Sequence, residues 1–338
     1  MNPTGCAAVT SSAGDPGASE SHTLSERGQL TEAEVAQVAE LIDEVADADG
    51  VSPVNEHVLL HLRHGGDVDS SNFLLHSADG TLLGYGHLDP TDPVAGPAAE
   101  LAIHPGHRGK GLGRRLLTAV ERASPDGRLR LWAHGAHAGA EALAQQAGYR
   151  RTRVLWQMRK SLLAHLPQVE IPEGVRFRQF VPGQDEAAWT ALNNLAFADH
   201  PDQGGWSEDD ILLREKEPWF DPAGFLLAET VSTHVSAGKS EPELIGFHWT
   251  KIHGSSTSER AGKHAHEPIG EVYVLGVHPS ARGMRLGPAL TLAGLRYLRS
   301  RGLSQVMLYV DESNAAAIAV YSALGFTRWD TDVSYLRD

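Results

Sequence analysis

The feature that most constrains this chain is a motif that occurs twice. Residues 100–113 and 274–287 both combine an apolar strand-like segment, a His-Pro pair, an Arg-Gly turn and the start of an apolar helical segment. The pairs His104-Pro105 and His278-Pro279 lie 174 positions apart in a chain of 338 residues. Because a repeat of this length corresponds to a whole domain and not to a solenoid unit, the sequence predicts two related domains in tandem.

The composition excludes several classes of protein. A net charge of −14 argues against broad binding to nucleic acid or to anionic membranes, because both need a basic surface. No apolar run is long enough to span a bilayer. The 18 histidines are scattered without metal-ligand spacing, so we expect no metal. Cys6 is the single cysteine, which excludes an intrachain disulfide and fits a cytoplasmic location. Nothing suggests an obligate assembly, so we expect a monomer.

The domain organisation follows from composition and from the repeat. Residues 1–26 are rich in Gly, Ser, Ala and Pro and are predicted to form a disordered tail. We place the first domain at 27–163, a Pro-containing linker at 164–174 and the second domain at 175–338. Each half reads as strands and helices in mixed order, including a hairpin that turns at Asp79-Gly80. This order predicts the α+β class, with a mixed, mostly antiparallel, twisted sheet flanked by helices in each domain.

The Arg-x-x-Gly-x-Gly turn between a strand and a helix is suited to holding an anion. Glycine permits positive φ and close approach of a ligand, and the free amides of the turn and the helix start converge on phosphate oxygens. The first copy keeps this pattern from Arg108 to Gly113, whereas the second has Arg285 where the first has Gly111. An ordinary tight turn is the alternative, but its recurrence favours phosphate binding. If position 285 needs positive φ, arginine costs about 1 kcal/mol or more there.

These loops resemble those of the GNAT acetyltransferase superfamily, which bind the pyrophosphate of acetyl-CoA. Further segments resemble the mycothiol synthase family within it, namely residues 49–56, 200–206, 246–251, 270–277, 308–314 and 320–326. That family acetylates the cysteinyl amine of Cys-GlcN-Ins, a small pseudo-disaccharide thiol, in the last step of mycothiol biosynthesis. The resemblance therefore implies an N-acetyltransferase with acetyl-CoA as donor, in which the first domain binds CoA without catalysing the reaction and the second is catalytic.

The resemblance also implies which residues bind acetyl-CoA. In the first domain they are Leu101, Ala102, Ile103, Arg108, Gly109, Lys110, Gly111, Leu112 and Gly113. In the second domain the strand and loop supply Leu275, Gly276, Val277, Arg282, Gly283, Met284, Arg285, Leu286, Gly287 and Pro288. The following helix of the second domain adds Asn314, Ala315, Ala316, Ala317, Ile318 and Ala319.

Acetyl transfer to an amine needs a base for the ammonium and an acid for the leaving thiolate. By resemblance, Glu271 is the general base, acting through water, and Tyr321 is the general acid. At the repeat offsets of 174 and 177, the first copy has Pro97 and Ala144 at these positions. A structural role would more readily have kept similar bulk in both copies, so the comparison assigns the chemistry to the second domain.

The acceptor is rich in hydroxyl groups and cationic at its amine, so its site needs carboxylates and hydrogen-bond donors. The resemblance implies contacts from Glu56, Asp202, Lys251, Glu271 and Tyr309. Because Glu56 belongs to the first domain, we expect the acceptor to lie between the domains. Trp206 and Trp249 are expected to shape the walls of this pocket.

Two other functions suit the same residues. The chain could be a tandem GNAT enzyme that acetylates another cationic amine, such as an aminoglycoside or a protein N-terminus, since acidic groups suit any such acceptor. It could also be an acetyl-CoA sensor without catalysis, which describes the first domain well. Glu271 and Tyr321 argue against a sensor role for the whole chain.

Overall fold

The structure is a computed structural model that describes residues 22–65, 69–91, 96–198, 205–231, 242–254 and 267–337. The first half of the chain contains β1 (Thr23–Arg27), α1 (Glu32–Asp49), α2 (Glu56–His64), β2 (Ser71–His76), β3 (Leu82–Asp89), β4 (Ala98–Ile103), α3 (Leu112–Ala123), β5 (Leu129–Ala133), α4 (Ala138–Gln146) and β6 (Arg150–Ser161). The second half contains β7 (Val175–Gln179), α5 (Glu186–Ala196), α6 (Glu208–Glu215), β8 (Phe225–Thr230), β9 (Leu244–His253), β10 (Ile269–Val277), α7 (Leu286–Ser300), β11 (Gln305–Asp311), α8 (Ala315–Ala323) and β12 (Thr327–Arg337).

Local sequence signals fix several of these boundaries. Thr31 and Glu34 form a reciprocal capping box at the start of α1, and Gly50 ends that helix in the left-handed conformation. The Asn55 side chain caps α2 by accepting a hydrogen bond from the amide of Val58. Because Asn55 starts the helix, the next residue, Glu56, lies on its first turn.

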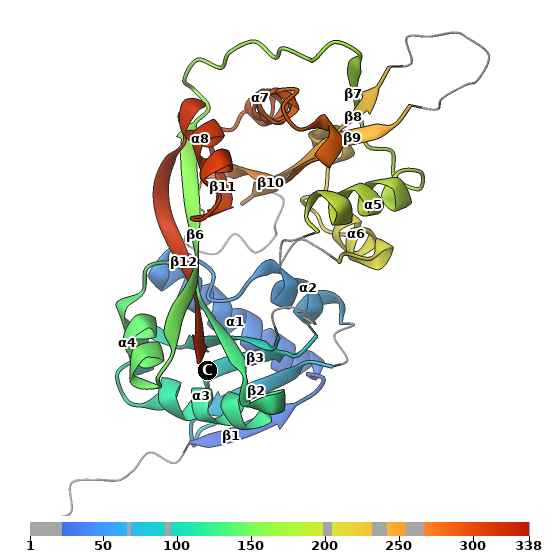
Figure 1. Cartoon of the computed structure of the whole chain (residues 1–338). Coiled ribbons are helices and arrows are strands. Elements are labelled where there is room, and N and C mark those ends of the chain that lie inside the picture. The colour runs from blue at the N-terminus through green and yellow to red at the C-terminus, as the bar shows by residue number, and fades with distance from the viewer. Residues whose placement is uncertain are drawn as a thin grey trace, which may run out of the picture.

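All twelve strands form one sheet in the order β1-β2-β3-β4-β5-β12-β6-β11-β10-β9-β8-β7. The pairs β4–β5 and β10–β11 are parallel and the others are antiparallel. The last strand of each half is exchanged: β6 pairs with β11 of the second half, and β12 pairs with β5 of the first half. Figure 1 shows β6 and β12 running between the two lobes as their connection. The predicted α+β class is confirmed, but the two halves share one continuous sheet.

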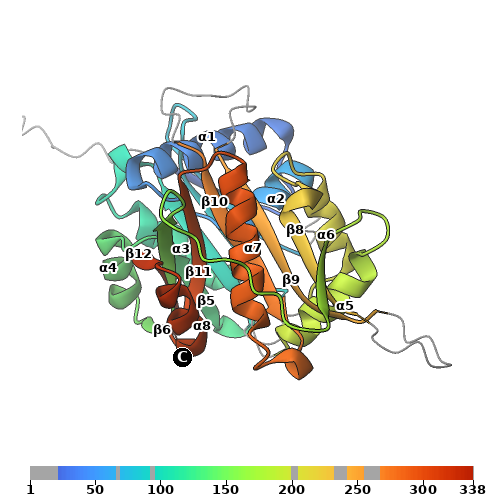
Figure 2. The same cartoon turned by 90° about the horizontal axis from the view of Figure 1, so that it is seen from above.

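Neighbouring residues on a strand point to opposite faces of the sheet. Both faces carry apolar side chains, and helices cover both of them. On β2, Phe73 packs in the cluster that includes Leu116 of α3, whereas Leu74 packs in the cluster that includes Leu41 of α1. In the second half, α7 lies across the sheet (Figure 2), and Trp189 of α5 packs in a separate aromatic cluster.

Two expectations from the sequence need correction. Residues 23–26 were assigned to the disordered tail, but they lie in β1, which pairs antiparallel with β2 and packs Leu24 against the first-domain core. Trp249 was expected in the pocket wall, but its side chain is fully buried in the aromatic cluster around Trp189. Residues 1–21 of the predicted tail lie outside the described part of the chain.

Candidate active site

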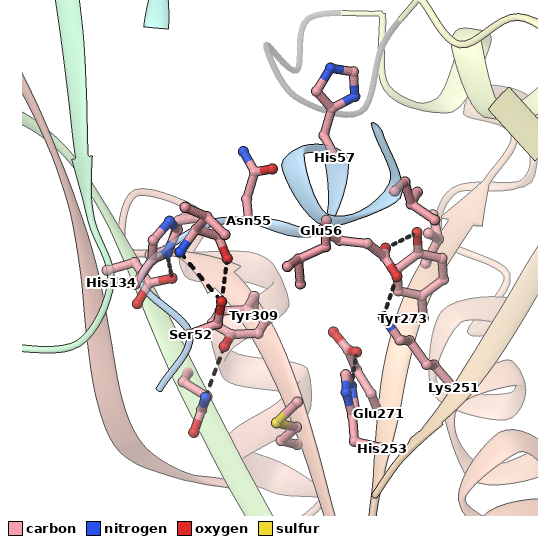
Figure 3. Close-up of a pocket in the computed structure, with 18 of the residues that line it drawn as sticks. Ser52, Asn55, Glu56, His57, His134, Lys251, His253, Glu271, Tyr273 and Tyr309 are labelled. Carbon is pink, nitrogen blue, oxygen red and sulfur yellow. Dashed lines mark hydrogen bonds and ion pairs between the residues drawn. The ribbon is translucent and has the colours of Figure 1, made fainter. Parts of the chain in front are cut away.

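A cavity of about 2360 Å³ lies between the two halves, and side chains of both line it. Figure 3 shows Glu56 on α2 facing Lys251, Glu271 and Tyr273 on β9 and β10. Its wall also includes Tyr309, Tyr321 and Trp206, so four of the predicted catalytic and acceptor-binding positions meet Glu56 in one space. Asp202, the remaining predicted acceptor contact, lies outside the described residues.

Glu271 lies on β10 and is 7% exposed. Its Oε2 atom is 2.6 Å from Nε2 of His253, on the neighbouring strand β9. Its Oε1 atom has no hydrogen-bond partner within the described ranges. The carboxylate therefore has one oxygen held and one oxygen available to a ligand in the cavity.

A β-bulge at Tyr273 distinguishes β10 from its counterpart β4 in the first half. The register of β9 with β10 skips Tyr273 between Val272 and Val274, whereas β3 with β4 has no such irregularity. The parallel pairing with the next strand places Glu271 opposite Met307 and Ala98 opposite Arg130. The structural counterpart of Glu271 is therefore Ala98 and not Pro97, because the bulge adds one residue to β10. Either residue leaves the first half without a carboxylate here.

Tyr321 lies on α8, lines the cavity and contacts the ring of Phe326 at a centroid distance of 5.8 Å. No described residue forms a hydrogen bond with its hydroxyl. Burial raises the pKa of Tyr321 to about 12, so the phenol stays protonated at neutral pH and can donate a hydrogen bond. Its counterpart, Ala144, is buried in the core of the first half.

A charged cluster joins the two halves across the cavity. Glu56 of α2 accepts hydrogen bonds from Lys251 and from the hydroxyl of Tyr273. The Nε atom of Arg214 donates to the same hydroxyl at 2.7 Å. Burial alone would raise the pKa of Glu56, but the charges of Lys251 and Arg214 outweigh it and hold the pKa below its ordinary value. Glu56 therefore carries a negative charge at neutral pH.

The sequence did not identify Arg214 or Tyr273 as part of this cluster. Tyr273 stands within the Gly-Glu-Val-Tyr segment next to Glu271, which was a usable signal. Arg214 lies on α6, a helix that the sequence did not predict, so it gave none. Tyr309 lies apart from the cluster and accepts a hydrogen bond of 2.9 Å from the amide of Gln157.

The two predicted phosphate loops have the same backbone conformation. In the first, Gly109 and Gly111 have φ values of 75° and 82° before α3. In the second, Gly283 and Arg285 have φ values of 85° and 59° before α7. Position 285 thus keeps the left-handed geometry of Gly111, and Arg285 is the only non-glycine residue with positive φ in the described part of the chain.

The two loops share these φ values, but their first arginines differ in the contacts of their side chains. Arg108 makes a bidentate ion pair with Asp49, at 2.7 Å for each bond, and lies 3.0 Å from Nε2 of His137. Arg282, its counterpart, forms no side-chain hydrogen bond or ion pair with any described residue. The first loop has its guanidinium bound internally, whereas the guanidinium of the second loop has no partner among the described residues.

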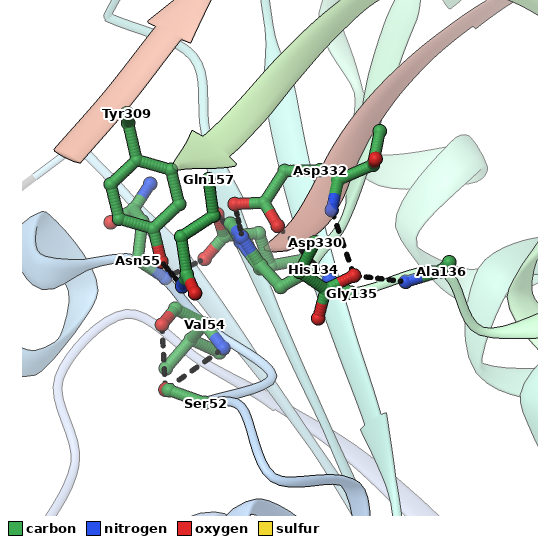
Figure 4. A network of polar contacts seen from close by, with 12 residues as sticks. Ser52, Val54, Asn55, His134, Gly135, Ala136, Gln157, Tyr309, Asp330 and Asp332 are labelled. Atoms are coloured by element: carbon green, nitrogen blue, oxygen red, sulfur yellow. Dashed lines mark hydrogen bonds and ion pairs between the residues drawn. The ribbon is translucent and has the colours of Figure 1, made fainter. Parts of the chain in front are cut away.

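A second buried charged network surrounds His134 (Figure 4). His134 lies 2.9 Å from Glu100 and 2.9 Å from Asp332, a residue of the exchanged strand β12. Burial alone would lower the pKa of His134, but the two carboxylates outweigh it and raise the pKa to about 10. The imidazole is therefore a cation at neutral pH, and it lies between Glu100 of the first half and Asp332 of the second.

Within the described ranges, no group of three or more His, Cys, Asp or Glu side chains could hold a metal ion. No described helix has both the length and the apolar character needed to cross a bilayer.

Comparison with known proteins agrees with this architecture. The sequence profile of the acetyltransferase (GNAT) family matches residues 40–149 and 189–326. Mycothiol acetyltransferases from Streptosporangium roseum and Acidothermus cellulolyticus are 54% and 53% identical over 91% and 92% of the chain and 97% and 93% of their own lengths. A solved GCN5-related N-acetyltransferase from Sphaerobacter thermophilus is 26% identical with a TM-score of 0.64, covering 93% of this chain and 95% of that one.

A tandem GNAT protein from the clavulanic acid biosynthesis pathway shares the fold, with a TM-score of 0.67 at 20% identity over 94% of this chain and 98% of that one. Two matching family units, one shared sheet and a cavity between the halves define a tandem GNAT N-acetyltransferase. Within this class, the chain belongs to the mycothiol acetyltransferase family.

Proposed function

We propose that the chain transfers the acetyl group of acetyl-CoA to the cysteinyl amine of Cys-GlcN-Ins, which yields mycothiol. The observation that carries this proposal is the wall of the interdomain cavity. It combines a carboxylate and a protonated phenol, whose Oε1 and hydroxyl have no partner among the described residues, with charged groups from both halves. The relatives' name, mycothiol acetyltransferase, supports this acceptor, and these residues supply the chemistry that such an acceptor needs.

The second phosphate loop suits the diphosphate of acetyl-CoA. Left-handed residues at 283 and 285 turn the backbone into the start of α7, where helix amides are free to bind an anion. The guanidinium of Arg282, which has no side-chain partner in the described ranges, adds a cation to this loop. The free Oε1 of Glu271 would take a proton from the ammonium, directly or through water, because only the neutral amine attacks a thioester. An α-amino group titrates near pH ~8, so a weak base suffices.

Tyr321 would donate a hydrogen bond to the sulfur as CoA leaves. A pKa of about 12 makes its phenol a weaker acid than a thiol of pKa ~8.5, so the hydrogen bond stabilises the departing thiolate while the proton stays on the phenol. The hydroxyl-rich part of the acceptor would contact Glu56, Lys251 and Tyr309, with Asp202 as a further expected contact. We expect a monomer in the cytoplasm, which size-exclusion chromatography and cell fractionation would test.

The test is to incubate the purified full chain with acetyl-CoA and Cys-GlcN-Ins and to follow the acetylated product by mass spectrometry. An aminoglycoside and an N-terminal peptide serve as competing acceptors. Acetylation of Cys-GlcN-Ins with a kcat/KM at least ~100-fold above the others supports the proposal. No product would refute it, and preference for another amine would favour a different tandem GNAT activity.

A further inference from the structure

Strand β9 offers Glu271 two neighbours that could pair with it. In the antiparallel register Lys251 stands directly opposite Glu271, and His253 stands two residues further along the same strand, opposite Ile269. Residues two apart on a strand share a face, so both side chains can reach the carboxylate. The side chain that pairs with Glu271 determines which charge lies beside its carboxylate.

Lys251 is directed elsewhere. Its ammonium binds Glu56 of α2 and lies over the rings of Trp219 and Tyr273, at 4.7 and 5.2 Å from their centroids. A lysine on Glu271 would place a permanent positive charge on the carboxylate and weaken it as a base. The pairing of Lys251 with Glu56 therefore holds the ammonium away from Glu271.

His253 occupies the place that Lys251 leaves. Its Nε2 atom is 2.6 Å from Oε2 of Glu271, and its side chain is 34% exposed against 9% for that of Glu271. An ionised carboxylate only accepts hydrogen bonds, so Nε2 carries the hydrogen in this pair. The bond fixes Oε2 and leaves Oε1 without a partner among the described residues (Figure 3).

We propose that His253 is the positioning residue of the base: it holds Oε2 of Glu271 so that Oε1 faces the amine. The inference rests on the proposed function for the identity of the acceptor. A base held within hydrogen-bond reach of the reacting amine gains rate from orientation, and a displacement of about 1 Å can cost about 100-fold. The charged or titratable groups that line the cavity around this face include Glu56, Lys251, Glu267, Tyr273, Tyr309 and Tyr321.

The test compares His253→Ala, His253→Gln and the control His76→Ala in the full chain. His76 ends β2 and does not line the cavity. We expect kcat of His253→Ala to fall about 10- to 100-fold while the Kd for acetyl-CoA, measured by calorimetry, stays within about twofold. His253→Gln keeps an N–H donor and should recover kcat to within about fivefold of wild type. The control should match wild type.

Rescue by the conservative variant separates positioning from general packing. An unchanged kcat in His253→Ala would overturn the inference, as would a His253→Gln enzyme no faster than His253→Ala at equal melting temperature.

A substrate-free measurement keeps the inference separate from the proposed function. We expect an imidazole Nε2–H resonance in the ¹⁵N NMR spectrum. Glu271→Gln should shift this resonance, and His253→Gln should remove it. Absence of that resonance would overturn the pairing even in an active enzyme. Wild-type enzyme that shows the resonance but never acetylates Cys-GlcN-Ins would refute the proposed function alone.

Discussion

Replacing Glu56 by glutamine tests whether the two halves are held together by charge at the active site. The carboxylate accepts hydrogen bonds from Lys251 and Tyr273, and its loss leaves Lys251, whose side chain is 10% exposed, without its counter-ion. Removing one partner of a fully buried ion pair costs about 3–5 kcal/mol. Because the Glu56 side chain is 22% exposed, we expect about 2–3 kcal/mol for Glu56→Gln.

The measurement is urea unfolding followed by tryptophan fluorescence, with Glu44→Gln as the matched control. Glu44 is a surface carboxylate, 3.1 Å from His104 with its side chain 50% exposed, so its loss should cost under about 0.5 kcal/mol. Adding Lys251→Met to Glu56→Gln removes the unpaired charge and should recover at least about 1 kcal/mol. Equal costs for Glu56→Gln and Glu44→Gln, or no recovery in the double variant, would refute the reasoning.

The same pair predicts a pH dependence. The pKa of Glu56 lies below its ordinary value of 4.5 in the folded protein, so its stabilisation is complete above that value. As the pH falls through the lowered pKa, the native carboxylate is protonated and the contribution disappears. The difference in unfolding free energy between wild type and Glu56→Gln should therefore be constant near neutrality and shrink below pH 4.5. A difference that grows on acidification would contradict the assigned charges.

Four further variants test the other assignments. Glu271→Gln and Tyr321→Phe should each lower kcat by about 10- to 1000-fold without loss of acetyl-CoA binding, and near-normal rates would remove these residues from the mechanism. Arg285→Gly relieves a left-handed arginine, so its melting temperature should equal or exceed that of wild type; a clear fall would mean that the guanidinium stabilises the loop. Gly111→Ala should cost about 1 kcal/mol and weaken acetyl-CoA binding in the first half while kcat stays near wild type, and a matching loss of kcat would place chemistry there.

The parts of the site that the sequence predicted correctly are those with local signals. The left-handed turn at Gly109 and Gly111 follows from the glycine pattern, whereas the sequence left positive φ at Arg285 open and the structure shows it there. The hairpin at Asp79 is local in the same way. Such features depend on a few consecutive residues, so one copy can predict the other.

The parts that the sequence missed depend on strand register. The bulge at Tyr273 shifts the counterpart of Glu271 by one residue, and nothing in the residue types marks it. The pairing of His253 with Glu271 needs the alignment of β9 with β10 across a long insertion. The exchange of β6 and β12 joins segments far apart in the chain, and a repeat offset cannot reveal which half a terminal strand pairs with.

The strand exchange gives the first half a structural part in the second, even though the first half lacks counterparts of Glu271 and Tyr321. Strand β12 is hydrogen-bonded to β5 on one side and β6 on the other, so removing the first half would leave both of its edges open. Asp332 and Asp330 of that strand accept hydrogen bonds from the amides of Gly135 and Ala136, just before α4. Glu56 adds the counter-ion of Lys251. The first half thus supplies strand pairing to the second half and a counter-ion to the candidate site, and the two halves form one structural unit even though their sequences read as separate copies.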